Sequence, residues 1–224
     1  MNCAQKFRRE KEIHQGVRSV KALIIVDVQN DFMPGGALGV PEGNDILPVI
    51  NDLLKKSFDF IIATKDWHPK EHGSFALNHN KKPGEHVILC GKDQVLWPTH
   101  CVQGTKGSEF AHGFDTRKVH KVFYKGTDRE VDSYSAFFDN AHLRATGLGD
   151  FLIENEIDEV YIAGLATDYC VKYTVLDALK LGFKTYIVAD GCKGINLNPD
   201  DVDKAIKLMQ SKGAEVVSSE SISL

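Results

Sequence analysis

The run Ala22-Leu23-Ile24-Ile25-Val26 decides the fold, because it is short, rich in β-branched residues and followed at once by the polar cluster Asp27-Val28-Gln29-Asn30-Asp31. An apolar run of this length, bounded by polar residues, is typical of a buried strand. Similar runs recur at 58–63, 119–124, 160–163, 185–189 and 215–217. The sequence therefore predicts six strands.

Helical patterns separate several of these strands. Apolar residues follow 3.6-residue spacing over 46–54 and again over 202–209. For the second of these helices, Asn198 is the predicted N-cap, Pro199 the first helical residue and Gly213 the C-terminal cap.

A third helix is expected to begin at Thr167 and end at Gly182. Strands that alternate with helices form right-handed crossovers and a parallel sheet. We therefore expect a three-layer α/β/α fold, Rossmann-like, with a mainly parallel six-stranded sheet.

Composition and charge narrow the class of protein. The chain has 224 residues, 42% of them hydrophobic and 26% charged, as in ordinary globular proteins. We expect a single domain over 22–224, preceded by a flexible basic arm over 1–21. The net charge of −4 argues against nucleic acid or an anionic membrane as a partner. No apolar run is long enough for a membrane span. Five cysteines without a C-x-x-C pair favour a reducing compartment, and we expect the cytoplasm.

Chemically active residues follow the predicted strands. Asp27 ends the first strand, Asp66 and His68 follow the second, Lys125 follows the third, and Cys170 lies just beyond the fourth. In open parallel sheets the ligand crevice lies at this carboxyl edge. The irregular insertion over 69–116 is the kind of segment that is either functional or disordered.

Cys170 is the candidate nucleophile. With Thr167 as N-cap it falls in the first helical turn, where the helix dipole is expected to lower the pKa of its thiol. Asp27 could accept the thiol proton, and Lys125 could keep that carboxylate charged. The remaining cysteines are interpreted as small hydrophobic residues; they are Cys3, Cys90, Cys101 and Cys192.

A metal site is the second candidate feature. Asp66 and His68 are two residues apart, which places both side chains on the same side of an extended segment, and His100 could complete the set. Mixed carboxylate and imidazole ligands suit zinc, iron or manganese. His72 and His86 remain open as further ligands.

Five ordered motifs carry a resemblance to a known family. The motifs are Asp27-Val28-Gln29-Asn30-Asp31-Phe32, Asp66-Trp67-His68-Pro69, Trp97-Pro98-Thr99-His100-Cys101, Lys125-Gly126-Thr127-Asp128 with Asp132-Ser133-Tyr134-Ser135, and Gly164 to Val171. With these motifs the chain, between residues 22 and 218, resembles the nicotinamidase branch of the isochorismatase-like hydrolases. The resemblance implies hydrolysis of nicotinamide to nicotinate and ammonia in NAD salvage, with pyrazinamide as a second substrate.

The resemblance also implies roles for individual residues. It places a catalytic triad on Asp27, Lys125 and Cys170, and one divalent metal ion, with zinc preferred over iron or manganese, on Asp66, His68 and His100. It implies a cis peptide bond between Leu165 and Ala166, which would join the N–H groups of Ala166 and Cys170 in an oxyanion hole. The implied aromatic pocket for the substrate ring consists of Phe32, Trp97, Tyr134 and Tyr169.

Other functions remain as alternatives. The isochorismatase branch is disfavoured, because it uses neither the thiol nor the metal set. Another amidohydrolase of the family, acting on a carbamoyl group or another aromatic amide, would keep the triad. A non-catalytic metal-binding or redox-sensing protein would use Cys170 as a sensor thiol. A homo-oligomer is left open.

Overall fold

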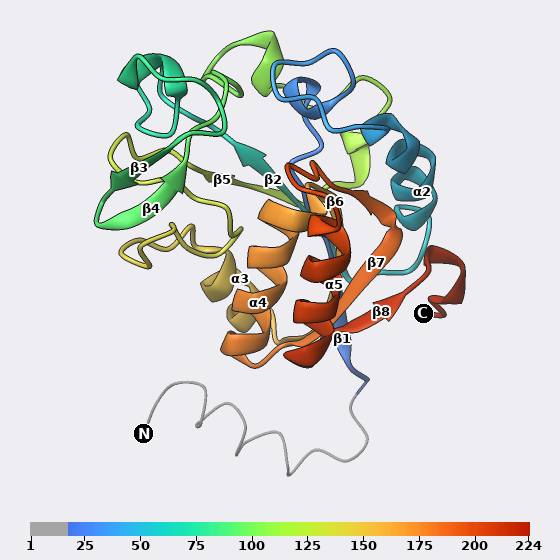
Figure 1. The fold of residues 1–224 in the computed structure, drawn as a ribbon. Helices are drawn as coiled ribbons and strands as arrows, with labels where there is room; N and C mark the ends of the chain where they lie inside the picture. Colours follow the sequence, from blue (N-terminus) through green and yellow to red (C-terminus); the bar gives the residue numbers. More distant parts are fainter. Residues whose placement is uncertain (1–17) are drawn as a thin grey trace, which may run out of the picture.

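The computed structural model describes residues 18–224, with β1 (Val20–Val26) near the centre of a six-stranded sheet (Figure 1). The order of the sheet is β5-β2-β1-β6-β7-β8, and every neighbouring pair is parallel. The other strands are β2 (Phe60–Asp66), β5 (Lys121–Lys125), β6 (Ile157–Leu165), β7 (Lys184–Lys193) and β8 (Glu215–Val217). The predicted six-stranded parallel sheet is thus confirmed.

Helices cover both faces of this sheet. Helix α2 (Ile46–Leu53) packs on one face, and the opposite face is covered by α3 (Leu148–Glu154), α4 (Lys172–Leu181) and α5 (Asp201–Ser211). The three-layer architecture is therefore confirmed as well. Helix α3 was not predicted from the sequence, because its seven residues are too few to show a clear period.

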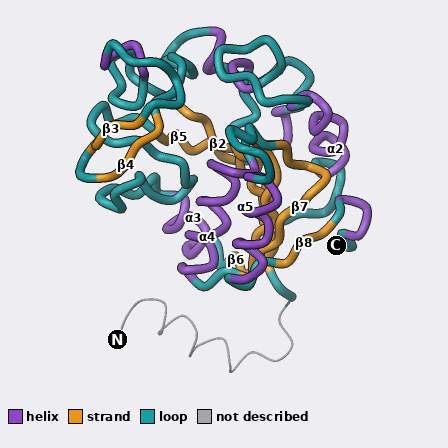
Figure 2. Tube along the Cα trace, in the orientation of Figure 1, coloured by secondary structure: helices purple, strands orange, loops and turns teal. Residues whose placement is uncertain are grey.

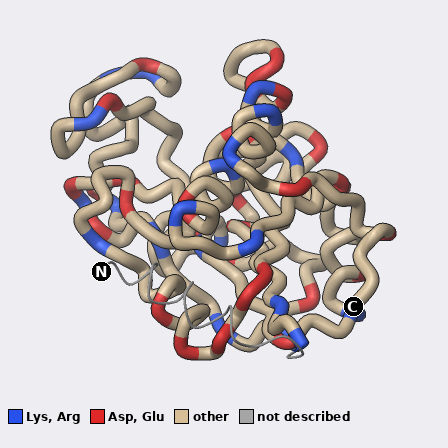
Figure 3. Tube along the Cα trace, turned by 90° about the horizontal axis from the view of Figure 1, so that it is seen from below, with Lys and Arg blue, Asp and Glu red and all other residues tan. Residues whose placement is uncertain are grey.

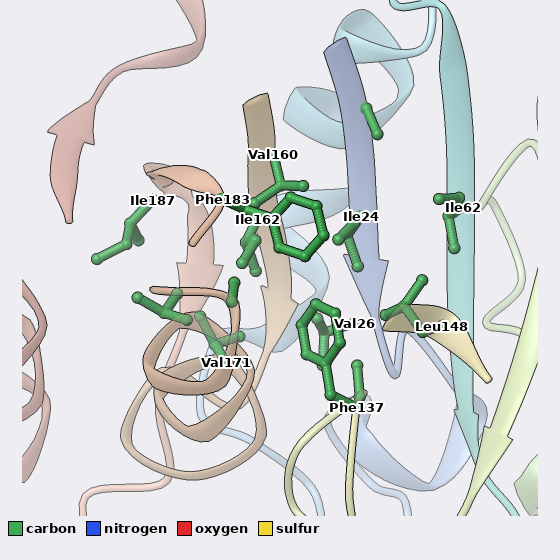
Figure 4. Close-up of a cluster of buried hydrophobic side chains, with 14 of the residues drawn as sticks. Ile24, Val26, Ile62, Phe137, Leu148, Val160, Ile162, Val171, Phe183 and Ile187 are labelled. Atoms are coloured by element: carbon green, nitrogen blue, oxygen red, sulfur yellow. The ribbon is translucent and has the colours of Figure 1, made fainter. Parts of the chain in front are cut away.

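The period of two residues along β1 divides the core into two parts. Ala22, Ile24 and Val26 point to the side of α3, α4 and α5, where Figure 4 shows the apolar cluster around Ile24 and Val26. Leu23 and Ile25 point to the side of α2. All five side chains are fully buried, which explains why the strand is apolar throughout residues 22–26.

The predicted N-caps of two helices are wrong. Helix α5 begins at Asp201, not at Pro199, and the backbone N–H of Asn198 donates to the Asp201 carboxylate. The Asn196 side chain accepts from the N–H of Val202 instead, at 3.0 Å. A cap bond to the second helical residue is the usual one, and it can come from outside the expected position when the preceding loop turns back.

The turn that carries Cys170 also differs from the expectation. Residues Thr167–Val171 form a π-helical turn ahead of α4, and no side chain caps its start. Thr167 is therefore not an N-cap. The C-terminal predictions fit better, because Gly182 caps α4 with φ 93°, and Gly213, with φ 107°, follows Lys212, the C-cap residue of α5.

The insertion over 69–116 is ordered. It contains the antiparallel hairpin of β3 (His86–Leu89) and β4 (Lys92–Val95), with short 3-10 turns before it at Ala76–His79 and after it at Lys106–Ser108. Backbone bonds tie it to the sheet edge, including His68 N–H to the Cys101 carbonyl at 3.0 Å. Figure 2 shows these loops gathered at one end of the sheet.

The expected N-terminal arm lies mostly outside the described residues. Of the range 1–21, the structure describes 18–21, and Val20 and Lys21 already belong to β1. A single domain over 22–224 stays a prediction.

Basic and acidic residues are interspersed over the described chain in the view of Figure 3. Within residues 18–224, no helix has the length and apolar character that a membrane span requires.

Gly164 allows β1 and β6 to approach closely near the carboxyl edge. It pairs with Val26 in the sheet register, with φ 126°. A Cβ atom at this position would lie 2.1 Å from the Val26 carbonyl oxygen. Only glycine fits both the conformation and the space.

We predict that Gly164→Ala will lower the free energy of unfolding by well over ~1 kcal/mol, because the backbone of β1 would have to move. Urea denaturation measures this change. Gly149→Ala in α3 is the control, since its added Cβ would lie 3.6 Å from Leu181, an ordinary contact. Equal stability of the two variants would contradict the packing argument.

Candidate active site

A buried ammonium lies at the centre of the carboxyl edge. Lys125 ends β5 and pairs in register with Asp66, the last residue of β2. Its Nζ lies 2.8 Å from Asp66 Oδ1 and 2.8 Å from Asp27 Oδ2. All three side chains are almost completely buried. One positive charge therefore faces two carboxylates in a low-dielectric environment.

Cys170 completes this cluster. Its Sγ lies 3.4 Å from Lys125 Nζ, which also donates to the Ser133 carbonyl at 2.9 Å. The π-helical turn after β6 carries the thiol to this point, next to the strands that carry Asp27 and Asp66. The structure thus brings together the acid, the ammonium and the thiol that the sequence placed at strand ends.

The expected lowering of the thiol pKa is wrong. Burial and the carboxylates of Asp27 and Asp66 raise the pKa of Cys170 well above its ordinary value, and Lys125 offsets only part of this effect. Burial likewise raises the pKa of Asp27, against the opposing charge of Lys125. A protonated thiol beside a carboxylate with raised pKa suits general-base activation, in which the proton moves as the sulfur attacks.

Thr64 holds Asp27 in place. Its hydroxyl donates to Asp27 Oδ1 at 2.6 Å and accepts from the Asp27 N–H at 3.1 Å. Asp27 itself has φ 50°, a left-handed conformation that aspartate tolerates better than most residues. Sequence reasoning missed Thr64, although its place two residues before Asp66 on the same strand could have indicated it.

Two imidazoles converge on Asp66. His68 Nε2 lies 3.0 Å and His100 Nε2 lies 3.3 Å from Asp66 Oδ2. The Nδ1 atoms face backbone carbonyls, of Gly126 at 2.9 Å for His68 and of Pro98 at 2.7 Å for His100. When each Nδ1 donates its proton to these carbonyls and the imidazoles are neutral, both Nε2 lone pairs are free for a metal ion beside the carboxylate. This buried donor set fits a divalent metal ion, with oriented imidazoles as metal sites require.

Charge in this cluster also fits a cation. Although burial opposes ionisation, His68 and Lys125 hold the pKa of Asp66 well below its usual value. The same carboxylate raises the pKa of His68 against the effect of burial. An ionised ligand carboxylate is therefore available at neutral pH.

The two histidines left open differ in position. His72 is buried beside His68, with ring centroids 4.1 Å apart, and forms a second candidate group with His68 and Asp132. Its Nδ1 lies 2.7 Å from Ser74 Oγ, and its buried Nε2 has no hydrogen-bond partner among the described residues. His86 is exposed on β3 and pairs with Asp93, away from this group.

A narrow cavity joins the thiol, the metal-type ligands and the predicted aromatic pocket. Trp97 and Tyr169 meet edge to face at 4.8 Å, and Trp97 Nε1 donates to the Tyr134 hydroxyl at 3.1 Å. Leu38 and Ile195, which the sequence did not single out, also line it, because they lie on loops without a motif. The full lining is Phe32, Leu38, Asp66, Trp97, His100, Asp132, Tyr134, Ala166, Tyr169, Cys170 and Ile195.

The backbone around Cys170 has the implied cis bond. The Leu165–Ala166 peptide is cis, and the Ala166 carbonyl accepts from the N–H groups of Tyr169 and Val171, on either side of Cys170. Ala166 and Cys170 line the same cavity. The oxyanion role of their N–H groups stays a prediction.

Comparison with known proteins agrees with this geometry. The family model of the isochorismatase domain matches residues 21–221. A nicotinamidase of Escherichia coli is 47% identical over 87% of this chain and 92% of its own length.

Solved structures with the same fold include two relevant proteins. A nicotinamidase/pyrazinamidase of Acinetobacter baumannii has a TM-score of 0.87 and 45% identity, covering 91% of this chain and 98% of its own. A pyrazinamidase of Pyrococcus horikoshii, solved in complex with zinc, has a TM-score of 0.71 and 39% identity, covering 88% and 98%.

We predict that Lys125→Met will lower the free energy of unfolding by about 3–5 kcal/mol, because it leaves two buried carboxylates without their shared cation. Urea denaturation of the metal-free protein at neutral pH measures the change. Lys193→Met is the control, since Lys193 pairs with Glu42 at the surface and its loss should change stability little. A comparable loss in both variants would contradict a special role for the buried ammonium.

Proposed function

Because the chain belongs to the isochorismatase family, we propose that it is a nicotinamidase, which hydrolyses nicotinamide to nicotinate and ammonia. One observation carries this proposal beyond the likeness to relatives. A single cavity is lined by the candidate nucleophile Cys170, by the metal-type ligands Asp66 and His100, and by four aromatic residues. A flat heteroaromatic amide is the substrate class that such a cavity suits.

The aromatic side chains recognise the ring. Phe32 stands edge-on to His100 with centroids 5.6 Å apart, while Trp97 and Tyr169 form the facing edge-to-face pair. Apolar walls of this kind exclude water and stack on a flat ring. Tyr134 lies next to both residues of that pair, and its hydroxyl orients the Trp97 indole.

The thiol then acts as the nucleophile. Asp27 accepts the proton from Cys170 as its sulfur attacks the amide carbon, and Lys125 stabilises the negative charge that develops in this cluster. The N–H groups of Ala166 and Cys170 donate to the oxyanion, an interaction whose loss costs about 10²–10³ in rate in other hydrolases.

Collapse of the tetrahedral intermediate releases ammonia. Asp27 returns its proton to the leaving nitrogen, and a thioester to Cys170 remains. Asp27 next takes a proton from water, which attacks the thioester carbon. The thiolate leaves and takes this proton from Asp27, and the acid product loses its own proton to solvent as nicotinate, so that the starting protonation states are restored.

Asp66, His68 and His100 would hold one divalent metal ion in this mechanism. Zinc is the preferred metal, with iron and manganese as alternatives, because the donor set suits all three. When bound, the ion supplies a Lewis-acid template for the ring nitrogen of nicotinamide. The residues themselves fix the donor atoms through the carbonyls of Gly126 and Pro98.

The proposed setting is NAD salvage in the cytoplasm, with pyrazinamide as a second substrate because it presents the same carboxamide on a flat ring. Cysteine chemistry supports a reducing compartment. Within the described residues, the free cysteines are Cys90, Cys101, Cys170 and Cys192. A free nucleophilic thiol needs such an environment to stay reduced.

We expect Cys170→Ala to lower kcat for nicotinamide by about 10³-fold or more, because no other group can form the thioester. Ammonia release measures turnover, and binding of nicotinamide should persist. Cys192→Ala is the matched control, since this buried cysteine lies in β7 outside the cavity. Activity near that of the unchanged protein in Cys170→Ala would rule out the thiol mechanism.

We further expect His100→Ala to lose zinc and to raise KM for nicotinamide, because one of three ligands is removed. Metal content after dialysis measures occupancy independently of activity. The exposed His86 provides the control, and His86→Ala should keep both the metal and the KM. Full zinc occupancy in a His68→Ala, His100→Ala double variant would overturn the ligand assignment.

A further inference from the structure

The loop that follows β1 does more than carry Asp27. In residues 27–32, here called the β1 loop, the fully buried Gln29 side chain pairs with the backbone of Asp66. Its Oε1 accepts from the Asp66 N–H at 2.8 Å, and its Nε2 donates to the Asp66 carbonyl at 2.8 Å. The backbone of Asp66, a metal-type ligand at the end of β2, is thus held by the β1 loop.

Asp31, in the same loop, also bonds to the backbone beside a metal-type ligand, here next to His100. Its Oδ2 accepts from the Cys101 N–H at 2.7 Å, a span of 70 residues along the chain. Cys101 directly follows His100 and has φ 45°, a left-handed conformation that a cysteine rarely adopts. The hydrogen bond to Asp31 therefore holds the backbone next to His100 in a conformation that it would otherwise leave.

The same peptide reaches a second ligand. The Cys101 carbonyl accepts from the His68 N–H at 3.0 Å. The N–H of Cys101 thus donates to the Asp31 carboxylate, and the carbonyl of Cys101 accepts from the His68 N–H. A shift of this residue would move the backbone of both imidazole ligands together.

Gly107 makes room for the Asp31 carboxylate. A Cβ atom at Gly107 would lie 2.1 Å from Asp31 Oδ2 and 2.4 Å from Asp31 Cγ. Gly107 has no left-handed φ, and the three atoms nearest to an added Cβ all belong to the Asp31 carboxyl group, so a methyl group here would displace that carboxylate. The Asp31 carboxylate therefore lies between Gly107 and the Cys101 N–H, from which it accepts a hydrogen bond.

We propose that Asp31 is a positioning residue for the metal site, which sets His100 and His68 through the backbone of Cys101. The inference rests on the proposed function, since it concerns the metal ion that those histidines would hold. Asp31 does not itself line the substrate cavity, and its carboxylate accepts from backbone N–H groups, of Cys101 at 2.7 Å and of Ala37 at 3.4 Å, so it reaches the ligands through Cys101. Outer partners of metal ligands typically change metal affinity by about 10–100-fold.

The test measures the affinity for Zn²⁺ alone, by competition with a chromogenic chelator and without substrate. Asp31→Ala should weaken zinc binding by about 10–100-fold. Asp31→Asn should stay close to the unchanged protein, because its amide oxygen can still accept from Cys101. Gly107→Ala keeps the carboxylate but displaces it, and it should weaken zinc binding as Asp31→Ala does.

Asn30→Ala is the matched control. Asn30 lies in the same loop and also bridges to backbone, donating to the Lys106 carbonyl at 2.8 Å, but it reaches no ligand. Its loss should leave zinc affinity unchanged even where the melting temperature falls. In nicotinamide hydrolysis at limiting zinc, Asp31→Ala should raise KM more than it lowers kcat.

The outcomes separate this inference from the proposed function. Zinc affinity that is unchanged in Asp31→Ala, or lowered equally in Asn30→Ala, overturns the positioning role while leaving the nicotinamidase assignment intact. Failure of the unchanged protein to bind zinc overturns both the inference and the metal part of that assignment. If Asp31→Ala does not fold, Gly107→Ala decides in the same assay.

Discussion

The ammonium of Lys125, buried between two carboxylates, is the constraint on which the rest of the site depends. Burying a single charge is costly unless hydrogen-bond and charge partners surround it. The three N–H groups of Lys125 donate to the Asp66 carboxylate, the Ser133 carbonyl and the Cys170 sulfur. The Asp27 carboxylate lies 2.8 Å from the same nitrogen. The order β5-β2-β1-β6 makes this possible, because it sets the ends of the contributing strands side by side. The strand order therefore supplies the negative charges that stabilise the buried ammonium at the carboxyl edge of the sheet.

Much of this arrangement can be predicted from the sequence. Apolar runs locate the strands, parallel pairing brings their ends together, and the motifs identify the residues that meet there. What local patterns cannot give is burial in three dimensions. Position in a first helical turn suggests a lowered pKa for the Cys170 thiol, but burial and two nearby carboxylates reverse the sign. The roles of Thr64 and Gln29 depend on cross-strand contacts and were likewise hidden.

Shared residues couple the metal-type ligands to the nucleophile. Asp66 faces His68 and His100 with one carboxylate oxygen and Lys125 with the other. The β1 loop also connects the two parts of the site. Asp27 contacts Lys125 beside the thiol, whereas Gln29 and Asp31 hydrogen-bond to the backbone of Asp66 and Cys101 next to the metal-type ligands. A cation on the histidine side and a thiolate on the other would therefore stabilise each other through Asp66 and Lys125.

The different pKa values of Asp27 and Asp66 follow from the same geometry. Asp66 has two imidazoles and the ammonium as neighbours, which keep it ionised and make it a poor proton acceptor. Asp27 has a hydroxyl and a share of the same ammonium, so burial dominates and its pKa rises. The raised pKa makes Asp27 a stronger base, whereas the raised pKa of Cys170 makes its thiol a weaker acid, so the proton moves to Asp27 as the sulfur attacks and not before. Chemistry of this kind requires that the two carboxylates be unequal, and the histidines on one side of Lys125 make them so.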